Sequence, residues 1–294
     1  MLEAVPNVSE GRAREVIEAV GEAFGARARL LDVHSDPDHH RSVFTLVGEP
    51  DALVESLVAG TARALELVDL RLHDGVHPRV GVVDVVPVVP LRAGDMDAAK
   101  STALELAGRI GHELQVPVFL YGEIGEGRRP AFYRRGGLDE LARRLAAGEL
   151  EPAAGPDAID PRSGAVLVGA RAPLVAYNVV LDTGDLDLAR AIAAAVRESS
   201  GGLPGVQAIG LLLPGAHTVQ VSMNVVDLER AALHDVVDRV RREAAARGVE
   251  VRGGELVGLV PERVLVEAER AGVRVPGVDE THVLERALAT REGL

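Results

Sequence analysis

The apolar segments of this chain repeat once, and this repeat constrains the fold more than any other sequence feature. In each half, apolar runs of strand length and amphipathic segments of helix length follow the order strand, helix, strand, strand, helix, strand. The first half has predicted strands at residues 3–5, 28–33, 42–47, 80–89 and 117–120 and predicted helices at 13–24, 51–65 and 96–114. The second half has predicted strands at 176–181, 207–213, 219–225 and 249–252 and predicted helices at 186–197, 228–246 and 261–271.

A β-α-β-β-α-β order is typical of the split β-α-β, or ferredoxin-like, arrangement, with helices on one face of a mainly antiparallel sheet. The pattern therefore predicts an α/β (α+β) protein of two such subdomains, residues 1–172 and 173–294. Between the two patterns, Leu145 to Gly164 holds Gly, Pro, Ala and acidic residues with little periodicity. This stretch is interpreted as a linker or as a binding loop.

The charge of the chain excludes several classes of partner. With 32 basic and 45 acidic residues, its formal net charge is -13, whereas nucleic acid or an anionic membrane would require a broad positive surface. Without cysteine the chain has no disulfide, thiol nucleophile or zinc-thiolate site. The N-terminus does not resemble a secretory signal, and the apolar runs are shorter than the roughly 20 residues of a membrane span. We therefore expect a cytoplasmic protein.

The segment Gly75 to Pro90 carries the strongest indication of chemistry. It places His77, Arg79 and Asp84 on a proline-containing turn that leads into an apolar strand, and such rigid backbone suits a proton-transfer group. A charge at Asp84 must be paired, either with His77, whose tautomer it would fix, or with Arg79. Arg79 is predicted either to orient a carboxylate or to bridge to an acid such as Asp84.

Further polar residues before this segment are candidates for substrate contact. Arg41 is predicted to meet a substrate carboxylate through a bidentate pair, and the alternative is an exposed charge on a turn. Asn7 and Ser9 are predicted to cap the helix that starts near Arg12, to contact substrate, or both.

A metal site is not expected, although five of the nine histidines lie close together in the sequence, at His34, His39, His40, His73 and His77. The spacing of His73 and His77 aligns ligands only on a helix, and Gly75 and Pro78 prevent one.

Several segments together resemble one known family. The segments Pro6 to Arg12, Asp36 to Thr45 and His77 to Pro90 are similar to successive signatures of the formiminotransferase domain. The second half of that domain has similar signatures in Val206 to Gly210, Gln220 to Asn224 and Glu255 to Pro261. The resemblance extends over nearly the whole chain in matching order.

The resemblance implies a transferase that moves the formimino group from N-formimino-L-glutamate to N5 of tetrahydrofolate, its co-substrate, in histidine degradation. It also implies two α/β subdomains whose sheets face each other across an electropositive tunnel, a homodimer, and small molecules as the only substrates. In vertebrate relatives this domain is fused to a cyclodeaminase, and for this chain we expect the second activity to lie elsewhere. The family's catalytic histidine corresponds to His77, and the attacking amine and leaving amine need one group that accepts and then donates a proton.

The family's folate-binding loop corresponds to residues 155–164, followed by 169–171. The resemblance implies that its glycines approach the ring system and that an arginine meets the glutamyl tail. The predicted folate-binding residues are Gly155, Pro156, Arg162, Ser163, Gly164 and Arg171. The alternative interpretation of this loop is an interdomain linker.

The chain departs from the family pattern at four positions. Val8 and Val88 stand where the family commonly has Phe, His40 where it has Asn, and Val76 where it has Glu directly before the catalytic histidine. His40 is nevertheless a candidate substrate-binding residue with Arg41. These departures leave two alternatives open: a non-catalytic folate-binding or regulatory protein, and an enzyme that transfers a related one-carbon group such as formyl. The presence of His77 favours an enzyme.

Overall fold

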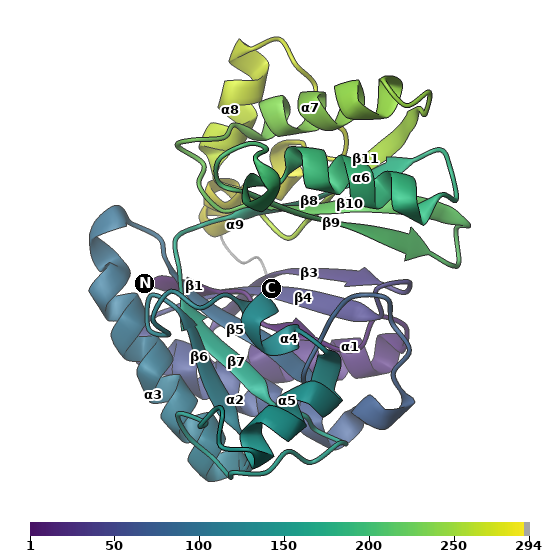
Figure 1. Cartoon of the computed structure of the whole chain (residues 1–294). Helices are drawn as coiled ribbons and strands as arrows, with labels where there is room; N and C mark the ends of the chain where they lie inside the picture. The colour runs from purple at the N-terminus through teal and green to yellow at the C-terminus, as the bar shows by residue number, and fades with distance from the viewer. Residues whose placement is uncertain (291–294) are drawn as a thin grey trace. The chain divides into compact units, whose positions relative to one another are not determined.

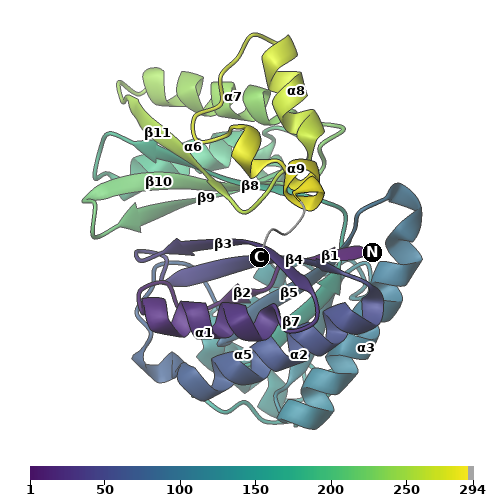
Figure 2. The same ribbon diagram turned by 180° about the vertical axis from the view of Figure 1, so that it is seen from behind.

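The computed structural model describes residues 1–290 and divides into two compact units, Met1–Ala172 and Pro173–Leu294 (Figures 1 and 2). Within the described part of the chain, no helix is long and apolar enough to cross a membrane.

The first unit is built on a mixed seven-stranded sheet. Its strands are β1 (Leu2–Ala4), β2 (Asn7–Val8), β3 (Arg29–Asp36), β4 (Arg41–Gly48), β5 (Val83–Pro90), β6 (Val118–Gly122) and β7 (Val166–Ala170). Its helices are α1 (Arg14–Phe24), α2 (Pro50–Leu67), α3 (Met96–Leu114), α4 (Pro130–Arg134) and α5 (Gly137–Ala146), with short 3-10 turns η1 (Leu70–Leu72) and η2 (Ala93–Asp95).

Strands β1 and β2 act as one interrupted strand, because both pair antiparallel with β4 on one side and β5 on the other. Strand β3 extends the sheet antiparallel beyond β4, and β7 and β6 extend it in parallel beyond β5. The first unit therefore contains a β-α-β-β-α-β core, β1-α1-β3-β4-α2-β5, to which α3, β6 and β7 are added.

The two faces of this sheet are covered by different helices. Helices α1, α2 and α3 lie on one face (Figure 2). Their packing against the sheet buries side chains such as Phe24, Phe44 and Leu106 completely. Helices α4 and α5 lie on the other face (Figure 1). They bring Tyr133 and Leu141 against β5, β6 and β7, in a separate apolar cluster. Helix α4 therefore holds its last residues over this second face of the sheet.

The second unit repeats the core topology in antiparallel form. Its strands β8 (Val175–Leu181), β9 (Val206–Leu213), β10 (Thr218–Val225) and β11 (Val251–Val257) lie in the order β11-β8-β10-β9. Its helices are α6 (Leu186–Val196), α7 (Leu233–Ala245), α8 (Glu262–Arg270) and α9 (Leu284–Ala289), with 3-10 turns η3 (Glu198–Ser200) and η4 (Glu280–His282). The same order, β5-β1-β4-β3, occurs in the first unit, so the predicted α+β fold with two split β-α-β arrangements is confirmed.

Some predicted boundaries were wrong. The helix expected from residue 228 begins at Leu233, and the strand expected from residue 80 begins at Val83. Strand β7 and helices α4 and α5 were not predicted. Because β7 returns the chain to the first sheet, residues 147–164 connect α5 to β7 inside the first unit and are not a linker between the two units.

Candidate functional site

Arg79 holds together the turn that carries His77. Its guanidinium donates hydrogen bonds to the carbonyl oxygens of Gly75 (2.8 Å), His77 (3.2 Å) and His73 (2.8 Å). Three carbonyls of one turn therefore share one positive charge. The described hydrogen bonds of Arg79 all go to backbone carbonyls, so the expected bridge to Asp84 is not formed, although the charge of Asp84 acts on Arg79 electrostatically.

The turn that carries His77 packs directly against the turn between β3 and β4. The amide of Val76 donates to the carbonyl of Asp38 (3.2 Å), and a Cβ atom at Gly75 would lie 2.2 Å from the carbonyl oxygen of His39. Only a residue without a side chain allows this approach. The imidazole rings of His40 and His73 stack with centroids 4.3 Å apart and join the same two turns.

Both stacked histidines are fixed by backbone groups. His73 places Nε2 2.7 Å from the His40 carbonyl and accepts the Gly75 amide at Nδ1 (3.1 Å), while His40 accepts the Gly11 amide at Nδ1 (3.1 Å). Burial lowers the pKa of His73 to about 4 and also lowers the pKa of His40, so both rings are neutral at pH 7. Both nitrogens of His73 are occupied, which leaves none for a metal. No cluster of three or more potential metal ligands was found among the described residues.

His77 has one nitrogen available for chemistry. Its Nδ1 lies 2.8 Å from the carbonyl oxygen of Pro78, and a carbonyl only accepts, so the proton of the neutral ring is on Nδ1. Nε2 then carries the lone pair, and no described residue forms a hydrogen bond with it. Burial, followed by the positive charges of Arg41 and Arg134 and by His39, holds the pKa of His77 well below its ordinary value. His77 is thus an uncharged base at neutral pH.

Asp84 is the centre of the charged groups around this turn. The residue is fully buried, and its carboxylate accepts hydrogen bonds from the Val80 amide (2.9 Å), from Arg41 Nη1 (2.8 Å) and from Arg134 Nη2. Burial opposes ionisation, but Arg134 and Arg41 outweigh it and hold the pKa of Asp84 below its usual range. Both expected pairings of Asp84, with His77 and with Arg79, were wrong, because two arginines distant in sequence occupy its oxygens.

Arg41 is buried and bound on two sides. Beside its bond to Asp84, its Nε donates to Asn7 Oδ1 at 2.9 Å, and the residue is only 8% exposed. Burial lowers the pKa of Arg41 to about 10, opposed by Asp84, so the side chain remains charged at neutral pH. The alternative of an exposed turn charge is therefore wrong.

Asn7 and Ser9 do not cap the first helix. The N-cap residue of this helix is Ala13, and no side chain caps it. Just before the helix, Glu10 Oε1 accepts the amides of Arg12 (2.7 Å) and Ala13 (2.9 Å). Asn7 instead holds Arg41, and the buried hydroxyl of Ser9 donates to the Gly81 carbonyl (2.8 Å). Both side chains thus stabilise the arrangement of β2 beside β4 and β5.

The predicted folate-binding residues lie in two places, before and after β7. Gly155 and Gly164 have φ of 88° and 73°, and a Cβ atom would lie 2.3 Å from the Val116 carbonyl oxygen and 2.2 Å from that of Val80, respectively. Pro156 follows Gly155, and the Ser163 carbonyl accepts the Val82 amide (2.9 Å). Residues 163–164 are thus brought to the start of β5.

The two predicted folate-binding arginines are not brought together. Arg162 Nη2 donates to the Glu66 carbonyl (3.1 Å), and Arg171 Nη1 donates to the Ala172 carbonyl (2.9 Å). They stand at opposite ends of β7. Arg171 lies with Arg134 near the hydroxyl of Tyr121, whose pKa burial raises to about 12, so this phenol stays protonated.

Arg134, at the end of α4, is the charged residue that the sequence analysis missed. Its contact with Asp84 spans 50 positions in the chain. The only sequence signal is a basic segment, Arg128 to Arg135, which contains four arginines in an otherwise acidic chain.

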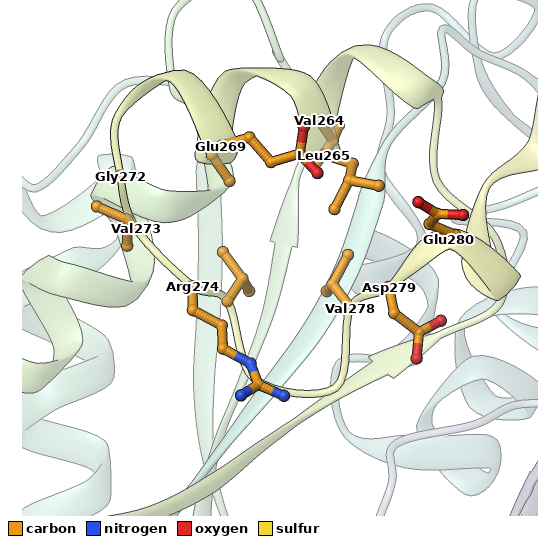
Figure 3. A pocket seen from close by; sticks show the side chains of 11 residues that line it. Val264, Leu265, Glu269, Gly272, Val273, Arg274, Val278, Asp279 and Glu280 are labelled. Atoms are coloured by element: carbon orange, nitrogen blue, oxygen red, sulfur yellow. The ribbon is translucent and has the colours of Figure 1, made fainter.

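One pocket lies far from these residues in the sequence, in the second unit between α8 and residues 272–280 (Figure 3). It has a volume of about 440 Å³, and the apolar side chains of Leu265 and Val278 point toward each other across it. Arg274, Asp279 and Glu280 also line it. None of the predicted site residues contributes to this pocket.

Known proteins resemble this chain over nearly its whole length. Residues 1–171 match the N-terminal subdomain of the formiminotransferase domain, and residues 176–276 match the formiminotransferase domain. A glutamate formimidoyltransferase of Thermoplasma acidophilum is 36% identical over 98% of this chain and 97% of its own length, and one of Streptococcus pyogenes is 36% identical over 98% of each. A formimidoyltransferase-cyclodeaminase of Rattus norvegicus is 39% identical over 91% of this chain, which spans 51% of that protein. The chain therefore belongs to the formiminotransferase family.

Proposed function

We propose that this protein is a glutamate formimidoyltransferase, which moves the formimino group from N-formimino-L-glutamate to N5 of tetrahydrofolate in histidine degradation. The observation that carries the proposal is full-length similarity to two glutamate formimidoyltransferases, at 36% identity. The site supports it, because a formimino transfer needs one base that also acts as an acid. His77, neutral and with Nε2 free, fits this requirement.

His77 acts twice in the proposed mechanism. As N5 of tetrahydrofolate attacks the amidine carbon, Nε2 takes the proton that N5 loses, and a tetrahedral adduct forms. Nε2 then gives this proton to the nitrogen of glutamate as the bond from carbon to that nitrogen breaks. The Pro78 carbonyl, 2.8 Å from Nδ1, keeps the ring in the tautomer that leaves Nε2 free and stabilises the imidazolium between the two steps.

The other predicted site residues are assigned supporting roles. Arg79 orders the His77 turn, and Asn7, Ser9 and His40 order the backbone around it. We assign the folate to the loop 155–164 and to Arg171. The proposed mechanism uses no metal ion, because acid-base chemistry at a nitrogen centre requires only a positioned proton carrier.

Incubation of the purified protein with formiminoglutamate and tetrahydrofolate tests the proposal. We expect 5-formiminotetrahydrofolate and free glutamate in equal amounts. Transfer only from formylglutamate would instead support the related one-carbon reaction, and folate binding without turnover would support a non-catalytic protein. Either outcome would refute the proposed reaction.

A homodimer stays a prediction based on the family, and a cytoplasmic location stays a prediction based on the sequence. Sedimentation equilibrium of the purified chain measures the first property: a mass of twice the 30.9 kDa of the chain is expected. A monomer that is fully active would contradict it.

A further inference from the structure

The ion cluster at Asp84 carries one positive charge too many. Arg41 and Arg134 share a single carboxylate oxygen of Asp84, and no other described acidic residue forms an ion pair with either arginine. The side chains of Asp84, Arg41 and Arg134 are 0%, 9% and 15% exposed. A charge withdrawn from water without a counter-charge is costly, so this cluster is suited to receive an anion.

Hydrogen bonding at Arg134 is incomplete as well. Nη2 is used by Asp84, but Nε is buried and has no hydrogen-bond partner in the described structure. Arg41, in contrast, is bound through Nε by Asn7 and through Nη1 by Asp84. Arg134 is also the more exposed of the two arginines. An incoming anion therefore meets Arg134 first, while Arg41 is held as part of the support.

We infer that Arg134 binds a carboxylate of the amino-acid substrate, with Asp84 holding its guanidinium in place. The inference rests on the proposed function for the identity of the substrate, whose two carboxylates persist through the reaction. A guanidinium matches a carboxylate with two parallel N–H donors, and an anion here also restores the charge balance of the cluster. Arg134 acts electrostatically on His77, which places the bound carboxylate in the field of the proposed base.

Steady-state kinetics of three variants test this role. Arg134→Gln removes the charge and should raise KM for formiminoglutamate roughly 10- to 100-fold, with a smaller change in kcat and in KM for tetrahydrofolate. Arg134→Lys keeps the charge without the planar fork and should be intermediate. Arg135→Gln changes the next residue, which is exposed, and should match the wild type. Thermal melts establish that each variant is folded.

Calorimetry with L-glutamate separates this inference from the proposed reaction, because it needs no turnover. We expect glutamate to bind the wild type and Arg135→Gln alike and to bind Arg134→Gln at least roughly 10-fold more weakly. The role of Arg134 is refuted if folded Arg134→Gln or Arg134→Lys binds glutamate as tightly as the wild type does. It is also refuted if an active Arg134→Gln has an unchanged KM for formiminoglutamate. Neither result would refute the proposed function. A wild type that neither turns over nor binds glutamate would overturn both proposals.

Discussion

At the scale of single residues, Asp84 organises the charged groups of the first unit. One buried carboxylate receives a backbone amide and two guanidinium groups that come from β4 and α4. It thereby fixes the start of β5, which follows the His77 turn. Removal of its charge would leave two buried cations facing each other.

We expect Asp84→Asn to lower the free energy of unfolding by about 3–5 kcal/mol at pH 7, because it leaves buried charges unpaired. Urea unfolding followed by circular dichroism measures this loss. Asp97→Asn, at an exposed carboxylate, is the control and should change stability by less than about 0.5 kcal/mol. Equal midpoints for the two variants would contradict the importance of the cluster.

Acid should remove the difference between wild type and Asp84→Asn. The pKa of Asp84 is depressed in the folded protein, so its stabilisation is complete above the unfolded pKa of about 3.9 and is lost as pH falls through the folded pKa. Unfolding at a series of pH values should show the two proteins converging below about pH 4. A difference that grew on acidification would contradict this sign.

His77 predicts a second pH dependence, in activity. The base must be unprotonated, and the buried, positively charged surroundings hold the pKa of His77 below 6.5. We therefore expect kcat/KM to be constant near neutral pH and to fall only on acidification below about pH 6.5. A loss of activity that began above pH 7 on acidification would exclude His77 as the group whose protonation causes the loss.

At the scale of elements, the site depends on direct contacts between two turns. The stacked rings of His40 and His73, and the close approach at Gly75, join the β3–β4 turn to the turn before β5. Every one of these contacts links segments more than 30 residues apart in the chain. The position of His77 is therefore a property of tertiary packing.

Gly75→Ala should separate these turns, since the added methyl group would lie 2.2 Å from the His39 carbonyl oxygen. We expect a loss of turnover of roughly 10-fold or more, because small displacements of a catalytic group cost rate steeply. Gly94→Ala is the matched control, since a Cβ atom there meets nothing within 4 Å. Equal turnover in the two variants would show that the contact between the two turns does not position His77.

Periodicity in the sequence predicted most of the elements because amphipathic segments such as α1 and α3 bury one face each. It missed β7, which has only five residues and is preceded by an irregular loop, and α4, which is little more than one turn. The sequence also required a partner for Asp84 but could not identify it. Arg134 is 50 positions away and is brought to Asp84 only by the packing of α4 on the sheet.

At the scale of the whole molecule, each unit has its own apolar core. The buried residues of the first unit form two clusters of their own, and those of the second form a third. This separation follows the duplicated β-α-β-β-α-β pattern. Each unit buries the apolar faces of its own helices and sheet.

Residues 1–172 and 173–294, expressed separately, should therefore each fold, and each should melt cooperatively in circular dichroism. Residues 173–294 should not transfer the formimino group alone, because His77 and the other assigned site residues lie in the first unit. Formimino transfer by residues 173–294 alone would contradict this assignment.

The central claim is that His77 carries the proton in a formimino transfer, and turnover of His77→Ala tests it most directly. Formation of 5-formiminotetrahydrofolate is followed for the wild type, for His77→Ala and for His112→Ala, which removes an exposed histidine from α3. We predict that the wild type and His112→Ala form product equally, whereas folded His77→Ala is slower by roughly 100-fold or more. A His77→Ala variant with wild-type turnover would contradict the claim.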